Sequence, residues 1–439
     1  MSRNKVNTEA QSELPTLTVW QLICFGALSL PIAMGGLVLA AFIPTYYAVD
    51  LGLGLSLVGF IFVAGRLLDV ITDPIIGYLS DKTQSPYGPR RPWIIIGLPF
   101  YCLAVWCLFS PPETATLTYL IIASGAYFLF YTIVDIPFSS VGLEISPYTD
   151  ERSILASAKG IFQTLGAVFA ALVPIIWALE TGASLSLTAK LLIGFCVTGL
   201  CLFLMFVPHR DRTVTAHQQS FIKTFKQTWV SRPYRFIIGA FLLTQTSSAF
   251  TVALTVLYVT NIIGAPELIG IFICIVLLSS ALFMPVWVWA SKRWSKKIAW
   301  TASIIICCLL LSFTPYFGAG DIIPYAIFCA FIGGTTGCDA IMPTSMLADI
   351  VYADEHEGKP RLAGLYLAGK NSVSKLTFIA PMGLAFPILE LAGFTSGSYN
   401  SPQTLFMLLF FYALLPILIK ICALFIVLKM PNTETLQTA

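Results

Sequence analysis

Apolar segments long enough to cross a membrane follow one another along almost the whole chain, with short polar connections between them. A membrane helix needs about 20 predominantly apolar residues to cross a hydrocarbon core of about 30 Å, and about twelve segments meet this requirement. The pattern therefore predicts an all-α membrane protein. The expected spans are 17–49, 56–80, 93–110, 115–143, 154–179, 185–207, 236–263, 268–290, 298–317, 322–352, 362–391 and 405–428.

The longest polar connection separates these spans into two groups of six. We predict a cytoplasmic tail at 1–16, an N-terminal half at 17–208, a cytoplasmic linker at 209–235, a C-terminal half at 236–430 and a second cytoplasmic tail at 431–439.

The two halves also resemble each other in sequence. Aligning Gly59 with Gly270 superimposes L-V-G-F-I-F on L-I-G-I-F-I, and it places Pro74 on Pro285. Parallel repeats of this kind are typical of transporters. The same alignment sets Asp69 on a serine and Asp73 on a methionine, so these acids occur in one half only.

Basic residues are concentrated in every second connection. They include Lys82, Arg90 and Arg91, Arg152, the 209–235 linker, Lys292 to Lys297, and Lys359 with Arg361, whereas the alternate connections are mainly acidic. Positive residues remain on the cytoplasmic side of a membrane. We therefore expect a multi-pass protein of the inner membrane with both termini in the cytoplasm.

Composition supports a membrane protein, since 57% of the residues are hydrophobic, 11% are charged, and the mean hydropathy is +0.83. The eleven cysteines lie in apolar runs, and the three histidines lack metal-ligand spacing. No nucleophile with an adjacent base is evident. We therefore expect no enzyme, no cofactor, no metal centre and no nucleic-acid partner; the expected partners are the lipid bilayer and a small-molecule substrate.

The second span carries charge inside an apolar run. Arg66, Asp69 and Asp73 are spaced i, i+3 and i+7, so on a helix they share a face about 60° wide. An ionised carboxylate at the centre of a membrane helix costs roughly 2.5–3.5 kcal/mol. Two such acids need cationic partners, a bound cation or a water-filled cavity.

Further ionisable residues fall within the predicted spans: Asp135, Lys159, Asp339, Lys370, Lys375 and Lys420. One interpretation is a substrate or ion pathway, and the other is a set of salt bridges that only holds the helices together. Lys420 has no obvious partner in the sequence, and snorkelling to the interface is a third possibility for its side chain.

Asp69 and Asp73 are candidates for binding a coupling cation. A hard cation such as Na⁺ takes oxygen ligands, and a hydroxyl could complete such a site. Thr132 is one candidate, and Thr72 is a weaker one because its position turns it off the face shared by the two acids. A proton would require the same carboxylates to hold it near neutral pH. The sequence leaves Na⁺ and H⁺ open.

At this level of detail the chain resembles a known family. The run R-L-L-D-V-I-T-D-P-I-I-G-Y-L-S-D-K-T, the loop Y-G-P-R-R-P-W, and the runs Y-T-I-V-D-I-P-F-S-S, D-E-R-S-I-L-A-S-A-K and L-A-D-I-V-Y-A-D-E-H-E-G-K-P-R-L-A-G-L-Y are similar to those of the glycoside–pentoside–hexuronide:cation symporters, the melibiose-permease branch of the major facilitator superfamily. The resemblance implies a major facilitator fold that transports a sugar or sugar derivative with Na⁺ or H⁺ by alternating access.

The resemblance also implies roles for individual residues. Asp69, Asp73 and Thr132 correspond to cation-site positions, Tyr131 and Asp135 lie beside the sugar pocket, and Lys375 lies between the two sites. Lys159 stands about where the family has an arginine. We expect Lys159 and Lys375 to help Asp135 bind and orient the substrate. Asp339 and Lys370 are further candidates for substrate binding, and Arg66, Asp81, Arg152 and Arg361 are expected in gating or structural salt bridges.

Two positions depart from the family pattern. The acidic sugar-binding position of the first helix appears as Pro31, with Leu30 before it, and Ser139 replaces an aromatic residue one turn after Asp135. Cation coupling is therefore better supported than a galactoside substrate. A facilitator or exporter of amphipathic or lipid-like molecules on the same fold is the alternative.

Overall fold

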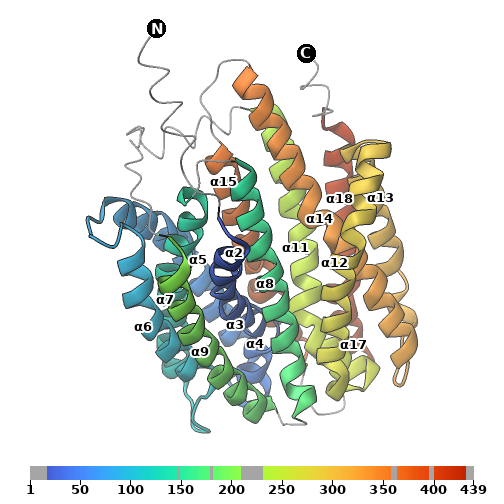
Figure 1. Ribbon diagram of the computed structural model, residues 1–439. Helices are drawn as coiled ribbons and strands as arrows, with labels where there is room; N and C mark the ends of the chain where they lie inside the picture. Colours follow the sequence, from blue (N-terminus) through green and yellow to red (C-terminus); the bar gives the residue numbers. More distant parts are fainter. Residues whose placement is uncertain are drawn as a thin grey trace, which may run out of the picture. The chain divides into compact units, whose positions relative to one another are not determined.

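The computed structural model describes residues 17–145, 149–177, 181–208, 231–356, 363–394 and 400–431. These residues form helices of several kinds and contain no strand (Figure 1). The elements that precede the central linker are α2 (Val19–Ala27), α3 (Ser29–Ala41), α4 (Ile43–Thr45), η1 (Tyr46–Asp50), α5 (Leu55–Lys82), α6 (Arg91–Phe109), α7 (Leu117–Glu144), α8 (Thr149–Ile176) and α9 (Thr181–Phe206).

The described elements after the linker are also helices. They are α11 (Arg232–Tyr258), η2 (Val259–Ile263), η3 (Pro266–Leu268), α12 (Ile269–Arg293), α13 (Lys296–Leu311), η4 (Thr314–Tyr316), α14 (Ile322–His356), α15 (Ala363–Leu376), η5 (Pro381–Ala385), α16 (Phe386–Leu391), α17 (Pro402–Leu409), η6 (Phe410–Leu414) and α18 (Leu415–Lys429).

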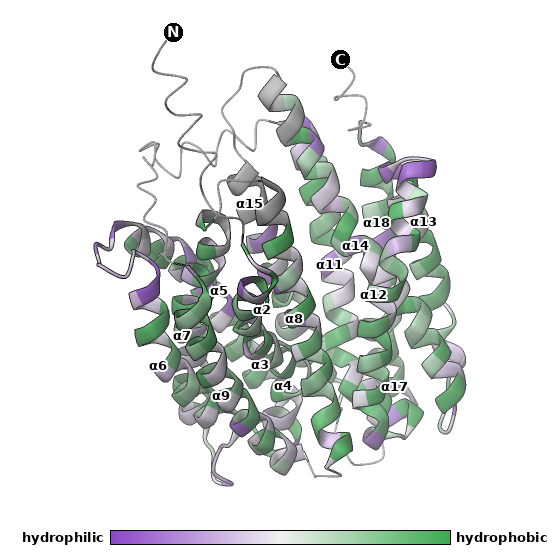
Figure 2. Ribbon diagram, viewed as in Figure 1, coloured by the Kyte–Doolittle hydropathy of each residue, from purple (hydrophilic) through white to green (hydrophobic). Residues whose placement is uncertain are grey.

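Twelve helical stretches in this part of the chain are long and apolar enough to span a membrane, which confirms the predicted all-α membrane fold. Figure 2 shows apolar residues along most of the helical surface and hydrophilic residues at helix ends such as the start of α13. The first predicted span is not one regular helix, since it consists of α2, α3, α4 and the π-helical turn η1. The break before α4 coincides with Pro44, which cannot donate a backbone hydrogen bond.

Several helices begin at side-chain caps that can be read from the sequence. Thr18 and Gln21 form a reciprocal capping box at α2. The hydroxyls of Thr116, Ser295 and Ser401 accept hydrogen bonds from backbone N–H groups in the first turns of α7, α13 and α17. Each cap satisfies one of the four backbone donors that a helix start leaves unpaired.

Contacts divide the chain into two compact units. Unit 1 comprises 1–38, 68–173 and 179–215, and unit 2 comprises 39–67, 174–178 and 216–439. The division passes through α5, because residues up to Leu67 cluster with unit 2 and residues from Leu68 onward cluster with unit 1. The predicted boundary at 209–235 stays a prediction, and most of that segment lies outside the described residues.

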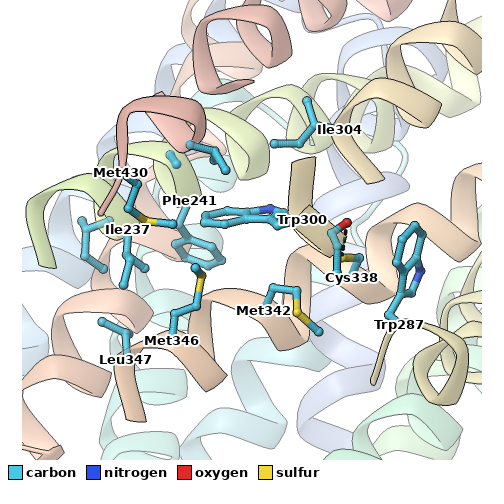
Figure 3. Packing of buried hydrophobic residues seen from close by; sticks show 14 of the residues in the cluster. Ile237, Phe241, Trp287, Trp300, Ile304, Cys338, Met342, Met346, Leu347 and Met430 are labelled. Atoms are coloured by element: carbon cyan, nitrogen blue, oxygen red, sulfur yellow. Dashed lines mark hydrogen bonds between the residues drawn. The ribbon is translucent and has the colours of Figure 1, made fainter. Parts of the chain in front are cut away.

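A hydrophobic cluster occupies the core of unit 2 (Figure 3). Trp300, Phe241 and Met346 are almost fully buried within it. Close to this cluster α12 and α14 approach so tightly that a methyl group at Gly333 would overlap the backbone of Val276. Glycine is therefore required at that crossing.

Candidate functional site

The cation ligands predicted from the sequence come together within unit 1. The Thr132 hydroxyl on α7 lies 3.2 Å from Asp69 Oδ1 and 3.1 Å from Asp73 Oδ1 on α5. Asp69 and Thr132 are fully buried, and Asp73 is partly buried. Three oxygen atoms from two helices therefore converge on one point.

The spacing of the two acids explains this geometry. Residues i and i+4 of a helix project from the same face one turn apart, so both carboxylates of α5 reach the same hydroxyl of α7. Thr72, the weaker hydroxyl candidate on α5, donates instead to the carbonyl of Leu68 at 3.0 Å. Its hydroxyl is thus engaged with its own helix, as expected for threonine in a helix interior.

A second polar cluster lies one turn further along α7. Asp135 Oδ1 is 3.7 Å from Lys159 Nζ, and the Ser139 hydroxyl is 3.4 Å from the same oxygen. Lys159 donates to Ser139 Oγ at 2.6 Å. The side chains of Lys159 and Asp135 are 20% and 16% exposed, so both charged groups remain open to a polar ligand.

Ser139 is a residue whose role the sequence did not predict. It stands at the position expected to hold an aromatic residue, and it bridges the acid and the base of this cluster. Its spacing of four residues from Asp135 places both on one helix face, which is the signal that could have identified it. Phe138 contributes an aromatic ring 5.3 Å from Lys159 Nζ and stacks on Phe25 with centroids 4.9 Å apart.

Tyr131 belongs to a tyrosine cluster beside these two groups. Its ring stacks on Tyr127 at a centroid distance of 6.1 Å and lies 6.2 Å from the ring of Tyr101. The hydroxyls of Tyr101 and Tyr127 are 3.4 Å apart and fully buried. The predicted contact of Tyr131 with substrate stays a prediction.

Asp339 lies in a different environment, in the interior of unit 2. Its Oδ2 is 2.7 Å from Lys420 Nζ, and its Oδ1 accepts a hydrogen bond of 2.9 Å from Trp300 Nε1. Asp339 and Lys420 are each 1% exposed. Lys420 therefore does not snorkel, because a buried carboxylate compensates its charge. Nothing in the sequence indicated that Asp339 is this partner.

This pairing changes the interpretation of Asp339. Both carboxylate oxygens are engaged by neighbouring side chains, so in this conformation neither is open to a substrate hydroxyl. Its predicted role in substrate binding stays a prediction, and the geometry favours a structural role. The salt-bridge interpretation thus fits this pair better than the pathway interpretation.

Three other predicted basic residues lie on α5 and α15. Lys370 Nζ on α15 lies 5.1 Å from the ring centroid of Phe241, and Lys375 is partly buried in the last turn of α15. Arg66 Cζ on α5 lies 5.5 Å from the ring centroid of Phe378. Arg361 and the side chains of Asp81 and Arg152 lie outside the described part of the structure.

The described residues hold no group of three or more histidine, cysteine and acidic side chains that could bind a metal ion. The Asp69–Asp73–Thr132 arrangement has only two such side chains, and its third oxygen is a hydroxyl. It therefore differs from a transition-metal centre and suits a hard, weakly bound cation.

Comparison with known proteins identifies the family. The profile described as "MFS/sugar transport protein" matches residues 24–434. The chain is 27% identical over 365 residues to the inner membrane symporter YicJ of Escherichia coli K12, covering 78% of this chain and 74% of that protein. It is 22% identical to the sodium-dependent lysophosphatidylcholine symporter 1 of Gallus gallus, covering 88% and 81% of the two chains.

A solved structure supports the fold. The crystal structure of the nucleoside transporter NupG superimposes with a TM-score of 0.67 at 13% identity, covering 93% of this chain and 99% of that one. At this identity the likeness concerns the fold alone. Together, the family profile over residues 24–434 and the symporter relatives show that the chain is a secondary symporter belonging to the MFS/sugar transport family of the major facilitator superfamily.

Proposed function

We propose that this protein is a Na⁺-coupled symporter that takes up a sugar or sugar derivative by alternating access. Asp69, Asp73 and Thr132 bind the coupling cation, and Asp135 and Lys159 bind the polar groups of the substrate. The observation that carries the proposal is the convergence of two carboxylates and one hydroxyl, from α5 and α7, within 3.2 Å.

The third oxygen favours a metal cation over a proton. A proton needs a single carboxylate, whereas Na⁺ needs several oxygen ligands and gains from a neutral one. In this structure the Thr132 hydroxyl lies within donating distance of both carboxylates. Rotation of this O–H would turn a lone pair of Oγ1 toward a cation held by the same carboxylates.

Asp135, Lys159 and Ser139 supply an acceptor and donors at one place. A sugar hydroxyl both donates and accepts, so adjacent hydroxyls match a carboxylate beside an ammonium group. Lys159 is separated from Asp135 by 3.7 Å, which is longer than a direct hydrogen bond. A substrate oxygen placed near Lys159 would therefore compete with a loose ion pair and with the hydrogen bond of 2.6 Å from Lys159 to Ser139.

The two groups are connected through one helix. Thr132 and Asp135 are three residues apart on α7, so a shift of this helix on cation binding also moves the substrate ligand. This arrangement supports coupling between cation and substrate within unit 1.

A second candidate substrate is an amphipathic, lipid-like molecule. One relative is named as a sodium-dependent lysophosphatidylcholine symporter. In this chain Phe25 and Phe138 stack close to Lys159, so a charged head group at Lys159 would have an apolar neighbour. The sugar is preferred because the matching family profile is described as a sugar transport protein.

Uptake into proteoliposomes tests both proposals. A panel of radiolabelled neutral sugars, uronates and lysophospholipids is supplied under an imposed inward Na⁺ gradient, an imposed pH gradient, or neither. We expect accumulation only under the Na⁺ gradient, and loss of accumulation in Asp73→Asn. Asp321→Asn, which changes an acid bonded to the Gly318 N–H in a polar turn, serves as the matched control.

The outcomes separate the alternatives. Accumulation under the pH gradient alone would identify H⁺ as the coupling ion and contradict the Na⁺ assignment. Accumulation of lysophospholipid but of no sugar would identify the second substrate. Transport that ignores both gradients would refute coupling altogether.

A further inference from the structure

Basic residues gather at the turn between α12 and α13, inside unit 2. The start of α13 is one of the hydrophilic helix ends visible in Figure 2. The sequence has no acid between Glu267 and Asp321, so neither helix carries a carboxylate of its own. Four bases fall within six residues at the turn: Lys292, Arg293, Lys296 and Lys297.

Two of these bases are engaged within the protein. Lys296 Nζ lies 2.6 Å from Asp349 Oδ1 on α14. Lys297 Nζ donates to the backbone carbonyls of Leu428 and Met430 at 2.8 and 2.7 Å. These contacts join the start of α13 to α14 and to the end of α18.

The other two bases, Lys292 and Arg293, are exposed. Within the described part of the chain, neither side chain has a hydrogen bond, an ion pair or a ring contact. Two adjacent positive charges at the end of a membrane helix are therefore available to an anion from outside the protein.

Two tryptophans lie next to these bases in the sequence. Trp289 is 59% exposed and Trp294 is 57% exposed, and their ring centroids are 5.5 Å apart in an edge-to-face arrangement. Tryptophan is enriched where a membrane helix passes from hydrocarbon to lipid head groups, because its ring is apolar and its N–H is polar. The indoles place Lys292 and Arg293 at the level of the head groups.

Exposed apolar side chains lead along α12 to this turn. Leu282, Val286 and Trp289 are all exposed. With Arg293 they are spaced i, i+4, i+7 and i+11, so the four side chains share a helix face about 60° wide. This face runs from apolar groups to a guanidinium, which matches the order from acyl chain to phosphate in a phospholipid.

The first repeat lacks this combination. The alignment of Gly59 with Gly270 sets Asp81 on Lys292 and Tyr78 on Trp289, so the charge at the aligned position changes from −1 to +1. Lys82, the base that follows in the first repeat, has its Nζ 4.4 Å from the ring centroid of Tyr78. The unengaged pair of bases is thus specific to the second repeat.

We propose that Trp289, Lys292, Arg293 and Trp294 form a binding site for one anionic phospholipid of the phosphatidylglycerol type. The planar guanidinium of Arg293 fits two phosphate oxygens, and Lys292 adds a second positive charge. A choline head group would bring its own cation beside two bases, so charge complementarity favours a lipid with net negative charge. The site goes beyond the proposed symport, whose cation and substrate ligands belong to unit 1.

Photo-crosslinking of the full-length protein in nanodiscs tests this site. The membrane is phosphatidylcholine with a small fraction of phosphatidylglycerol that carries a diazirine in one acyl chain, and mass spectrometry identifies the labelled peptides. We expect labelling within residues 278–298. Unlabelled phosphatidylglycerol should compete with the probe, whereas inorganic phosphate should not.

Lys292→Gln/Arg293→Gln removes both unengaged charges. Each base near an anionic lipid surface contributes about fivefold in affinity, so labelling at limiting probe should fall roughly 30-fold. The matched control is Lys82→Gln/Arg235→Gln, which removes the same charge from two exposed bases at other helix ends expected on the same side of the membrane. It should leave the labelling of residues 278–298 unchanged.

A phosphatidylcholine probe with the same diazirine chain separates a head-group site from general lipid contact. Equal labelling of residues 278–298 by both probes would overturn the proposal, as would an unchanged phosphatidylglycerol signal in Lys292→Gln/Arg293→Gln. An equal loss in the matched control would show that only overall charge attracts the lipid, and it would also overturn the site. The phosphatidylcholine probe reports folding, because a folded variant keeps the labelling pattern of the original protein elsewhere in the chain.

Discussion

Replacing Thr132 by valine removes one oxygen from the proposed cation site and changes little else. The side chain is fully buried, and valine has nearly the same shape as threonine, so we expect no cavity and no overlap. What disappears is a hydroxyl that lies 3.1 and 3.2 Å from two carboxylate oxygens.

The expected loss of affinity follows from these contacts. An interaction between a hydroxyl and a charged group is worth about 1.5–3 kcal/mol. Each 1.4 kcal/mol corresponds to a factor of ten, so Thr132→Val should weaken Na⁺ binding by about 10- to 100-fold. Thr132→Ser keeps the oxygen and should remain within a few-fold of the original protein.

The measurement is the thermal midpoint of the purified protein as a function of Na⁺ concentration. Choline chloride keeps the ionic strength constant. Ligand stabilisation grows as RT ln(1 + [L]/Kd), so the half-saturating concentration follows from the titration without knowledge of the substrate. An unchanged half-saturating Na⁺ concentration in Thr132→Val would refute the assignment of this hydroxyl as a ligand.

Three further predictions concern the other charged groups. Asp73→Asn should abolish Na⁺-driven accumulation while the protein still elutes as a folded species in size-exclusion chromatography; loss of the folded species would instead support a salt bridge. Lys159→Met should raise the substrate concentration for half-maximal uptake roughly tenfold or more, because a charged hydrogen bond is lost, while Na⁺ stabilisation stays unchanged. Asp339→Asn or Lys420→Met alone should lower the free energy of unfolding, measured in a denaturing detergent, by about 3–5 kcal/mol, and the double variant should recover much of this loss. Single variants whose free energy of unfolding stays within about 1 kcal/mol of the original protein would contradict a structural ion pair.

The sequence predicted those features that depend on local spacing. The length of the apolar segments located the twelve spans, and the i, i+4 spacing of Asp69 and Asp73 predicted that both carboxylates share a helix face. Thr132 was a hydroxyl candidate from the sequence and a cation-site position by the family resemblance, and the structure places its hydroxyl within 3.2 Å of both carboxylates. In each case the relevant geometry is set by one helix or by a motif that covers two helices.

Features that depend on distant pairing were missed. Lys420 and Asp339 are 81 residues apart, and no pattern along the chain indicates which acid an embedded lysine will meet. Glu390 lies in an apolar run, and it accepts a hydrogen bond from the backbone N–H of Ser56. A backbone N–H carries no sequence signal of its own. The π-helical turns, including η1 after Pro44, were likewise not predicted from the sequence.

The buried Asp339–Lys420 pair has a consequence for how the chain is assembled during synthesis. A charged residue at the centre of a single membrane helix costs roughly 2.5–3.5 kcal/mol to insert, and α14 emerges from the ribosome 81 residues before its lysine partner. Trp300 on α13 is already present and can donate to Asp339, but it brings no opposite charge. The charge of Asp339 is therefore neutralised only when α18, the last span, arrives. A nascent chain that stops before α18 would therefore leave the Asp339 carboxylate without its cationic partner, so the last span is needed to complete the interior of unit 2.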